Sequence, residues 1–346
     1  MVELNGKKIL VTFLMHLGDL TLTTPFIHAL RKAAPDAHIT MLVDEKLKDV
    51  VLFNPYLDEV VTIDKKGRDN SILSLWACSR HLSKLDFDVL INLHPNERCS
   101  FIDAMTSVKL RTGTTHKIFK WFWDVFTPLD RSMHAADMYL DVLQQLGVQD
   151  LSNNGLEIFP GEEHFLEAEL FWQEQNITDQ DKLIGFNIGS AVPTKRWPPE
   201  RFAEVADIFA AKGYKTVFFG GPMDEEMVAE ATGYMQTRPI IATGHFAIGG
   251  LAAAMRRCCL IITNDSGPMH VAISQKVPIV AMYGPSNPKL YGPYTKDAVI
   301  VTAQPPCQGC ADGMKHSCDD LQCMSRMTVE QVVAAAEKMF RPLCRT

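Results

Sequence analysis

Hydrophobic residues in the first half of the chain form short runs that alternate with stretches of helical spacing. The runs that predict buried strands are residues 8–14, 38–43, 59–63 and 88–93. The stretches that predict helices are residues 20–34, 71–84 and 136–146. Strands rich in β-branched residues that alternate with helices are typical of a parallel, doubly wound sheet. We therefore expect residues 1–160 to form a Rossmann-like α/β domain.

The alternation lapses between residues 155 and 181, where Pro160-Gly161 precedes an acidic, helix-like stretch, and then begins again. The second set of predicted strands is 183–188, 215–219, 239–242, 259–263 and 277–282. The second set of predicted helices is 199–212, 223–235, 248–256 and 268–275. This pattern predicts a second doubly wound domain over residues 181–327, with a cleft between the two domains. Residues 328–346 add an amphipathic helix, which we expect to pack back toward the N-terminal domain.

Length, composition and charge narrow the class of protein. A chain of 346 residues is longer than one typical core, which agrees with two domains. The formal net charge of −7 argues against a nucleic-acid binder, which needs a basic face. No apolar run approaches the ~20 residues of a membrane span, and no secretory signal is recognisable at the N-terminus. Nine cysteines, an odd number, suit a reducing compartment, so we expect a cytoplasmic protein.

A cluster of small polar residues lies between the predicted strand 259–263 and the helix after it. The cluster is Asn264-Asp265-Ser266-Gly267-Pro268-Met269-His270. Proline is tolerated in a first helical turn, and Asn264, Asp265 and Ser266 are all favoured N-cap residues. The free N–H groups and the positive end of the helix dipole would face the carboxyl edge of the sheet, where α/β proteins hold phosphates. This turn predicts a nucleotide site.

The first strand-to-helix turn carries Leu17-Gly18-Asp19-Leu20. Gly18 allows close approach of a ligand to the backbone, and Asp19 is placed at the carboxyl edge of the sheet. A carboxylate there acts as a general base if it reaches a substrate hydroxyl. The alternative is an N-cap aspartate, which this turn alone favours. Only the nucleotide-like second domain shifts the balance toward catalysis.

Two further turns in the second half are candidates for binding a nucleotide. Asn187-Ile188-Gly189-Ser190 is followed by Thr194-Lys195-Arg196-Trp197-Pro198, so a small-residue loop lies close to two basic residues. We interpret Lys195 as part of an anion clamp and Trp197 as a packing residue on the next helix. In the turn at 219–226, Asp224, Glu225 and Glu226 either hold ribose hydroxyls or are first-turn acids that the helix dipole favours.

A third candidate feature is Lys117-Ile118-Phe119-Lys120-Trp121-Phe122-Trp123-Asp124-Val125-Phe126, in which five aromatic residues accompany two lysines. Such a segment can lie at a membrane surface or hold a lipid-linked substrate. A core helix with two snorkelling lysines is the alternative. Arg98, Arg111 and His116 lie nearby in the sequence and, with Lys120, are candidates for binding an anionic acceptor.

Four cysteines near the C-terminus, Cys307, Cys310, Cys318 and Cys323, begin with a Cys-x2-Cys pair. That spacing is compatible with a structural zinc site, but the second pair is Cys-x4-Cys and no second zinc knuckle is recognisable. Structural zinc, disulfides and free thiols are all open for this cluster, and we assign it no role in catalysis.

Taken together, these motifs resemble the family 9 glycosyltransferases, the ADP-heptose:lipopolysaccharide heptosyltransferases. The resemblance covers almost the full chain and rests on the order and spacing of short segments. Those segments are Lys8-Ile9-Leu10-Val11, Leu17-Gly18-Asp19, Thr23-Thr24-Pro25, Ala33-Ala34-Pro35-Asp36-Ala37, Asn187-Ile188-Gly189-Ser190, Lys195-Arg196-Trp197-Pro198, Asp265-Ser266-Gly267-Pro268-Met269-His270 and Tyr283-Gly284-Pro285. The Lys-Arg-Trp-Pro form and the cysteine-rich tail look most like the heptosyltransferase II branch.

The resemblance implies a GT-B fold, with a lipid-linked saccharide acceptor on the N-terminal domain and ADP-heptose on the C-terminal one. It implies that Asp19 is the general base and that Lys195 contacts the donor phosphates. The other residues that it places with the donor are Gly18, Ser190, Glu225 or Glu226, Asp265, Ser266, Gly267, Met269 and His270. It also implies an inverting single displacement with one base, unlike the two carboxylates of glycosidases. The helix N-terminus and Lys195 would meet the leaving-group charge, so no metal is required.

One departure from the family stands in the first predicted strand. The family usually has Lys or Arg six residues before the aspartate, where this chain has Phe13. The acceptor and the exact donor are therefore open. The alternatives are a sugar-nucleotide epimerase with the same two-domain architecture, a transferase that uses another nucleotide-sugar, and a non-catalytic binding protein. For the leading interpretation we expect a monomer with peripheral contact to the cytoplasmic membrane.

Overall fold

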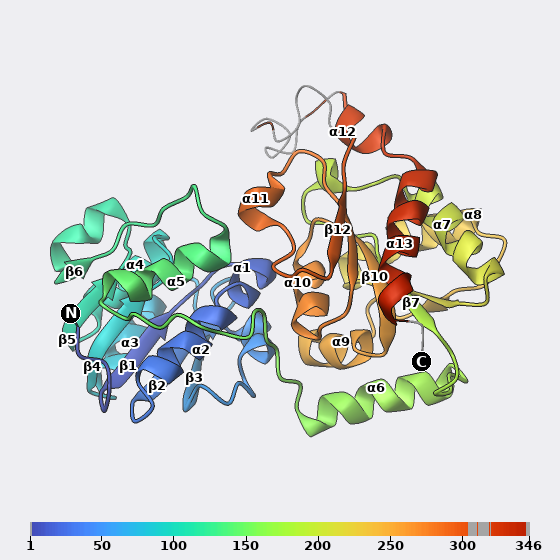
Figure 1. Cartoon of the computed structure of the whole chain (residues 1–346). Helices are drawn as coiled ribbons and strands as arrows, with labels where there is room; N and C mark the ends of the chain where they lie inside the picture. The colour runs from blue at the N-terminus through green and yellow to red at the C-terminus, as the bar shows by residue number, and fades with distance from the viewer. Residues whose placement is uncertain (1, 304–309, 311–317, 319, 344–346) are drawn as a thin grey trace. The chain divides into compact units, whose positions relative to one another are not determined.

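The computed structural model describes residues 2–303, 310, 318 and 320–343, and the chain divides into two compact units, Met1–Phe159 and Pro160–Thr346. Each unit contains one sheet of six parallel strands with helices around it (Figure 1). The predicted α/β class with two doubly wound, Rossmann-like halves is confirmed.

The first unit has the strand order β3-β2-β1-β4-β5-β6. Its strands are β1 Lys8–Thr12, β2 His38–Asp44, β3 Glu59–Ile63, β4 Phe87–Asn92, β5 Val108–Gly113 and β6 Val125–Phe126. Its helices are α1 Leu17–Thr21, α2 Thr24–Ala33, α3 Ile72–Ser83, α4 Glu97–Met105 and α5 Ala135–Gln145, with the 3₁₀ helices η1 Glu45–Val50 and η2 Lys117–Phe122. The central strand β1 lies between β2 and β4 and is buried apart from its first residue. Burial on both faces explains why such strands are continuous hydrophobic runs.

The second unit has the strand order β12-β11-β10-β7-β8-β9. Its strands are β7 Leu183–Asn187, β8 Lys215–Phe219, β9 Ile240–Ile241, β10 Cys258–Asn264, β11 Ile279–Met282 and β12 Ala298–Val301. Its helices are α6 Glu162–Glu174, α7 Pro199–Ala211, α8 Glu225–Tyr234, α9 Ile248–Met255, α10 Gly267–Ser274, α11 Pro288–Tyr291, α12 Gln322–Ser325 and α13 Val329–Leu343, with η3 Pro193–Lys195 and η4 Pro222–Asp224. In both sheets the strand pairs are parallel, so the loops that follow the strands gather at one edge.

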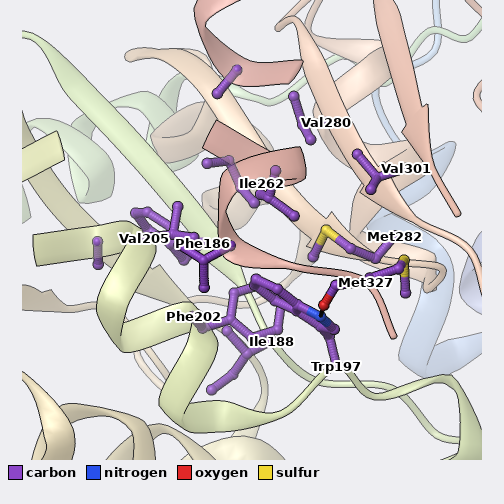
Figure 2. Packing of buried hydrophobic residues seen from close by; sticks show 14 of the residues in the cluster. Phe186, Ile188, Trp197, Phe202, Val205, Ile262, Val280, Met282, Val301 and Met327 are labelled. Carbon is purple, nitrogen blue, oxygen red and sulfur yellow. Dashed lines mark hydrogen bonds between the residues drawn. The ribbon is translucent and has the colours of Figure 1, made fainter. Parts of the chain in front are cut away.

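The core of the second unit forms around Trp197, whose side chain is fully buried (Figure 2). The indole packs edge-on against Phe202 of α7, and its Nε1 donates to the carbonyl of Met327 at 3.1 Å. The prediction that Trp197 packs on the next helix is confirmed. The buried indole N–H has the hydrogen-bond partner that burial requires.

Several predicted elements differ from the structure. The helix expected at 20–34 is two helices, α1 and α2, separated by Leu22 and Thr23. Strands β5, β6 and β12 and helix α4 were not expected. Helix α13, which we expected to pack toward the N-terminal domain, contacts α7, β10, β11 and β12 of its own unit.

The acidic stretch after Pro160 is helix α6, which packs on α9 within the second unit. A Cβ at Gly249 of α9 would lie 2.2 Å from Cε1 of His164 of α6, well inside van der Waals contact. Gly249 therefore lets the two helices approach closely. No helix within the described part of the chain has the length and apolar character that crossing a membrane requires.

Candidate active site

The carboxyl edge of the second sheet brings together the loops that follow β7, β10 and β11, with Asp265 at their meeting point. Lys195 Nζ lies 2.7 Å from Asp265 Oδ2, and both side chains are largely buried. The Ser286 hydroxyl, from the loop after β11, donates to the same carboxylate oxygen. A basic side chain is thus held directly beside the N-terminus of α10, next to a buried carboxylate.

Helix α10 begins without a side-chain cap. Ser266 occupies the N-cap position, but its hydroxyl accepts a hydrogen bond from Asn187 Nδ2 at 2.8 Å instead of one from the helix backbone. Asn264, another candidate cap, accepts from the backbone N–H of Trp197 and donates to the carbonyl of Ile188. Because the residues that could have capped the helix are used elsewhere, the N-terminus of α10 keeps its capacity to bind an anion.

The loop from Ser190 to Arg196 folds back on itself next to Asp265. Arg196 donates to the carbonyl of Ser190 through Nε at 2.9 Å and Nη2 at 2.7 Å. This contact explains why Arg196 is a structural partner of the loop and why Lys195 is the basic residue that reaches Asp265.

The three acidic residues after β8 lie in different surroundings. Asp224 accepts from the backbone N–H of Gly221 at 2.9 Å, and a Cβ at Gly189 would lie 2.1 Å from Asp224 Oδ1. Asp224 is therefore a first-turn acid whose side chain links the loops after β7 and β8. The Glu225 carboxylate lies near Gly244, which is in the loop after β9. Glu225 is therefore close to the carboxyl edge of the second sheet. Glu226 is exposed.

Four of the predicted donor residues have buried side chains, namely Ser190, Asp265, Met269 and His270. Met269 is fully buried and its sulfur lies 3.6 Å from the hydroxyl of Tyr283, and His270 is also buried. The side chain of Met269 therefore packs inside the unit. Of this turn, Asp265 is the residue that contacts the clamp residue Lys195.

In the first unit, Asp19 lies within α1, in its first turn, and the N-cap residue is His16. The alternative that Asp19 is an N-cap is therefore wrong. Gly18 precedes it in the same turn, and Asp19 is half-buried. The carboxylate is at the carboxyl edge of the first sheet, as predicted, because α1 directly follows the loop after β1.

A hollow of about 480 Å³ lies at the carboxyl edge of the first sheet, beside the N-terminus of α1. Its lining residues are Leu14, Met15, His16, Lys65, Pro95, Asn96, Glu97, Arg98 and His116. Nearby buried atoms that lack a hydrogen-bond partner within the described residues are Asn92 Nδ2, His94 Nδ1, Thr115 Oγ1 and His116 Nδ1. Buried polar atoms of this kind normally bind water. The hollow itself suits a polar molecule because its lining includes Lys65, Asn96 and Arg98.

Lys65, which sequence reasoning missed, is the main basic residue of this hollow. Its Nζ pairs with Asp44 at 3.1 Å and donates to the carbonyls of Leu14 and Met15 at 3.0 and 2.8 Å. Phe13, in turn, is buried and packs edge-on against His94 and Tyr139. The loop after β3 thus brings a cation to the backbone that follows β1. A basic residue two positions past a predicted strand is the signal that could have found it.

The electrostatic surroundings of His94 show that this edge is basic. Burial, together with the positive charges of Arg131, His16 and Lys65, lowers the pKa of His94 to about 4. The imidazole is therefore neutral at physiological pH. Asp44 and Glu97 balance part of this charge at Lys65 and His116. The guanidinium of Arg98 adds to it, so this edge favours an anionic ligand.

The predicted acceptor residues separate into two groups. Arg98 and His116 line the hollow, and Arg98 also donates to Asn70 Oδ1 and to the carbonyl of Lys65. Arg111 donates instead to the carbonyls of Asp103 and Thr106 at the end of α4, so its guanidinium serves the fold of the unit.

Lys120 lies on η2, with its Nζ 4.4 Å from the centre of the Phe126 ring. The alternative that this aromatic segment is a core helix is wrong, because η2 is a 3₁₀ helix without a buried residue.

Behind the hollow, Asp103 of α4 is completely buried. Its Oδ2 accepts from Thr12 Oγ1 at 2.8 Å, and burial raises the pKa of the Asp103 carboxyl to about 8. The carboxyl is thus protonated at neutral pH in the folded chain and ionised in the unfolded one.

We expect this protonation to make stability fall with rising pH. Between the unfolded pKa of about 3.9 and a folded pKa near 8, the folded state binds one proton more, so Asp103 lowers the unfolding free energy by about 1.4 kcal/mol per pH unit. His94 acts in the opposite direction, but only below pH ~6.5. Urea unfolding at two pH values between 6.5 and 8 should therefore show a fall in wild-type stability that Asp103→Asn lacks. An equal slope for both proteins would contradict the assignment.

The cysteine cluster is only partly described. Cys307 lies outside the described residues, and Cys323 is buried next to Gly284. The sulfur of Cys318 lies 3.2 Å from the carbonyl of Asp320. Within the described part of the chain, no group of three or more His, Cys, Asp or Glu side chains is arranged to hold a metal ion. A structural zinc at Cys307, Cys310, Cys318 and Cys323 stays a prediction.

Comparison with known proteins adds to this geometry. The family model described as "Glycosyltransferase family 9 (heptosyltransferase)" matches residues 75–318. Lipopolysaccharide heptosyltransferase 3 of Escherichia coli K12 is 24% identical over 341 residues, which cover 93% of this chain and 95% of that protein.

Two solved structures share the fold over nearly the whole chain. The crystal structure of the glycosyl transferase family 9 from Veillonella parvula DSM 2008 has a TM-score of 0.93 and 54% identity, covering 98% of each chain. The structure of E. coli ADP-heptose lps heptosyltransferase II has a TM-score of 0.77 and 21% identity, covering 96% of this chain and 98% of that one. The predicted GT-B architecture is confirmed by this agreement.

Proposed function

Because this chain belongs to glycosyltransferase family 9 and is a glycosyltransferase, we propose that it transfers heptose from ADP-heptose to a hydroxyl of a lipopolysaccharide inner-core acceptor. The names of its relatives support heptose as the transferred sugar and lipopolysaccharide synthesis as the pathway. Family membership leaves no support for the epimerase and for the non-catalytic binding protein. A transferase that uses another nucleotide-sugar is the second candidate, and Phe13 is the residue that favours it.

Our proposal for donor binding rests on the pairing of Lys195 with Asp265 at the uncapped N-terminus of α10. An ammonium group has three donors, so Lys195 can pair with Asp265 and still bind an oxygen of a diphosphate. The backbone N–H groups of α10 supply further donors, and the helix dipole favours the negative charge that develops as ADP leaves. Glu225 is the acid that we assign to the ribose.

On the acceptor side we assign Asp19 as the general base of a single, inverting displacement. The base accepts the proton of the acceptor hydroxyl as that oxygen attacks the anomeric carbon and the bond to ADP breaks. The basic hollow beside α1, with Arg98 and His116, would hold an anionic part of the acceptor. Because the acceptor is lipid-linked, the reaction would take place at the cytoplasmic face of the membrane.

A thermal-unfolding panel tests the donor assignment. We expect ADP-heptose to stabilise the protein most and ADP to stabilise it more than UDP, because we assign the site to ADP-heptose. A ligand at 100 times its dissociation constant adds about 2.7 kcal/mol to the unfolding free energy. Substituting Lys195 should reduce the effect of all the ADP compounds, because it weakens their binding. Stronger protection by a UDP-sugar would overturn the choice of donor and favour the second candidate.

A further inference from the structure

Two segments of the first unit expose large apolar side chains that the fold does not cover. On α3 these are Ile72, Leu73 and Trp76, which are 72%, 78% and 52% exposed, and on η2 they are Ile118, Trp121 and Phe122, which are 60%, 96% and 46% exposed. Isolated exposed apolar residues are ordinary, but three of them within one short segment, a tryptophan included, mark an interaction site, and both α3 and η2 carry such a set.

The exposure of η2 is built into the fold, because the segment is anchored in its middle and directly after its last residue. Phe119 packs edge-on against Phe101 of α4, with ring centres 6.3 Å apart. Trp123 is buried, and its Nε1 donates to the carbonyl of Thr112 at 3.0 Å. Ile118, Trp121 and Phe122 are therefore held on the outside of a fixed segment.

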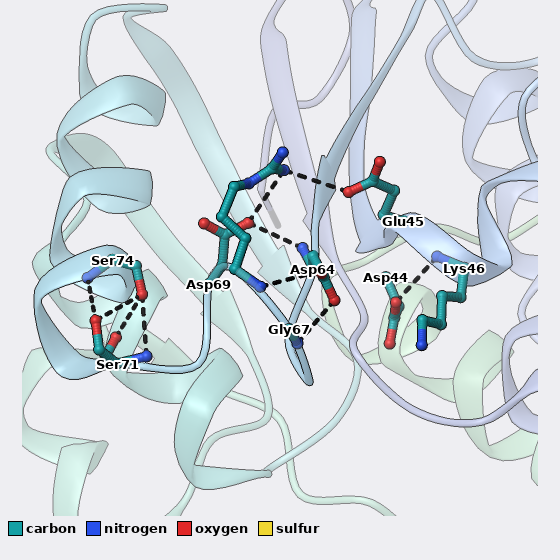
Figure 3. A network of polar contacts seen from close by, with 9 residues as sticks. Asp44, Glu45, Lys46, Asp64, Gly67, Asp69, Ser71 and Ser74 are labelled. Carbon is teal, nitrogen blue, oxygen red and sulfur yellow. Dashed lines mark hydrogen bonds and ion pairs between the residues drawn. The ribbon is translucent and has the colours of Figure 1, made fainter.

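The start of α3 is held in the same way. Ser71 and Ser74 form a capping box at its N-terminus, and in the preceding loop Asp64 accepts from the backbone of Gly67 while Asp69 accepts from that of Asp64 (Figure 3). On the inner side of the helix, Ser79 donates to the carbonyl of Ile102 of α4. Ile72 and Leu73 are thus presented by an ordered turn.

Both segments pack against α4 and begin at the carboxyl edge of the first sheet. Arg98, in the first turn of α4, donates to Asn70, two residues before α3, and His116 directly precedes η2. Arg98 and His116 also line the basic hollow. Both segments therefore begin beside residues that line the hollow, where we place the acceptor.

The charge of the two segments agrees with one kind of partner. The sequences of α3 and η2 contain Arg80, His81, Lys117 and Lys120 and no acidic residue, in a chain whose formal net charge is −7. Arg80 lies over the ring of Trp76, and Lys120 over that of Phe126. Tryptophans flanked by basic side chains suit the interface of an anionic bilayer, where the rings enter the headgroup region and the cations meet lipid phosphates.

We infer that α3 and η2 form a docking surface for an anionic lipid bilayer, consisting of Ile72, Leu73, Trp76, Arg80, Lys117, Ile118, Lys120, Trp121 and Phe122. This inference rests on the proposed function in one respect, since a lipid-linked acceptor requires the hollow to lie at the membrane. The surface would hold the entrance of the hollow at the depth of the headgroups.

Flotation with vesicles tests the surface. Full-length protein should float with vesicles that contain phosphatidylglycerol and not with vesicles of phosphatidylcholine alone, and high salt should weaken the binding. Lys117→Glu and Lys120→Glu should each reduce binding by at least about fivefold, the effect of losing one basic group near an anionic surface. Trp121→Ser should reduce it by at least about tenfold, because its apolar area no longer enters the interface.

Leu166→Ser is the matched control, because Leu166 is 60% exposed on α6 of the second unit and should have no effect on flotation. Protection by ADP against thermal unfolding separates this inference from the proposed function, since it should be the same in all four variants. Unchanged flotation of Trp121→Ser would overturn the docking surface. Self-association of the wild type that Trp121→Ser abolishes would also overturn it, in favour of a second copy of the chain.

Discussion

Replacing Asp19 with Asn should lower the rate of heptose transfer by about 10²–10⁴-fold, the contribution of a positioned general base. The amide keeps the size of the side chain but cannot accept the proton of the acceptor hydroxyl. Binding of ADP should be nearly unchanged, because the residues that we assign to the nucleotide are on the other unit. Single-turnover assays with saturating donor measure the first quantity, and calorimetry with ADP measures the second.

The matched control is Asp137→Asn. Asp137 is also a first-turn acid, on α5, so its substitution tests whether the loss of a charge near a helix N-terminus alone explains the effect. Transfer by Asp137→Asn should stay close to the wild-type rate. If Asp19→Asn retained that rate as well, the proposed base would be wrong, and another group at the same edge would have to accept the proton.

Lys195→Met should weaken both the fold and the binding of ADP. It leaves the Asp265 carboxylate buried without its cation, which costs about 3–5 kcal/mol of stability in comparable buried pairs. It also removes a donor to the diphosphate, so affinity for ADP should fall by about 30-fold or more, the equivalent of 2 kcal/mol for a buried charge contact. Chemical denaturation and calorimetry measure the two losses separately.

The double variant Lys195→Met/Asp265→Asn separates the two roles of Lys195. It removes the uncompensated charge, so stability should largely return while affinity for ADP stays low. Lys212→Met, which breaks the exposed pair between Lys212 and Glu337, should cost no more than about 1 kcal/mol and leave affinity unchanged. Recovery of ADP binding in the double variant would show that Lys195 serves only to neutralise Asp265.

Most of the fold could be predicted because the central strands are buried on both faces. β1, β7 and β10 are unbroken apolar runs that only a doubly covered parallel strand explains. β5 was missed because Lys109 and Arg111 interrupt its pattern in a strand that is only partly buried. α4 was missed because its buried face includes polar residues such as Ser100 and Asp103, which remove the amphipathic signal.

The candidate site could be predicted where its residues belong to one strand and the turn that follows it, as at Gly18-Asp19 and Asp265-Ser266. It could not be predicted where the contact joins two strands. Lys65 reaches Asp44 and the backbone after β1 because β2 lies between β1 and β3 in the sheet, and Ser286 reaches Asp265 because β11 is the neighbour of β10. Strand order decides these pairs, and a single sequence does not state it.

Phe13 stands where the family usually has a basic residue, and Lys65 supplies a cation at the same edge of the sheet. This has a consequence for how substitutions at the two positions combine. Phe13 packs against His94, and the positive charge of Lys65 already acts on that imidazole. A lysine at position 13 would place a second cation beside the first, whereas the same change together with the loss of Lys65 would restore a single cation at this edge. Positions 13 and 65 are therefore expected to be epistatic.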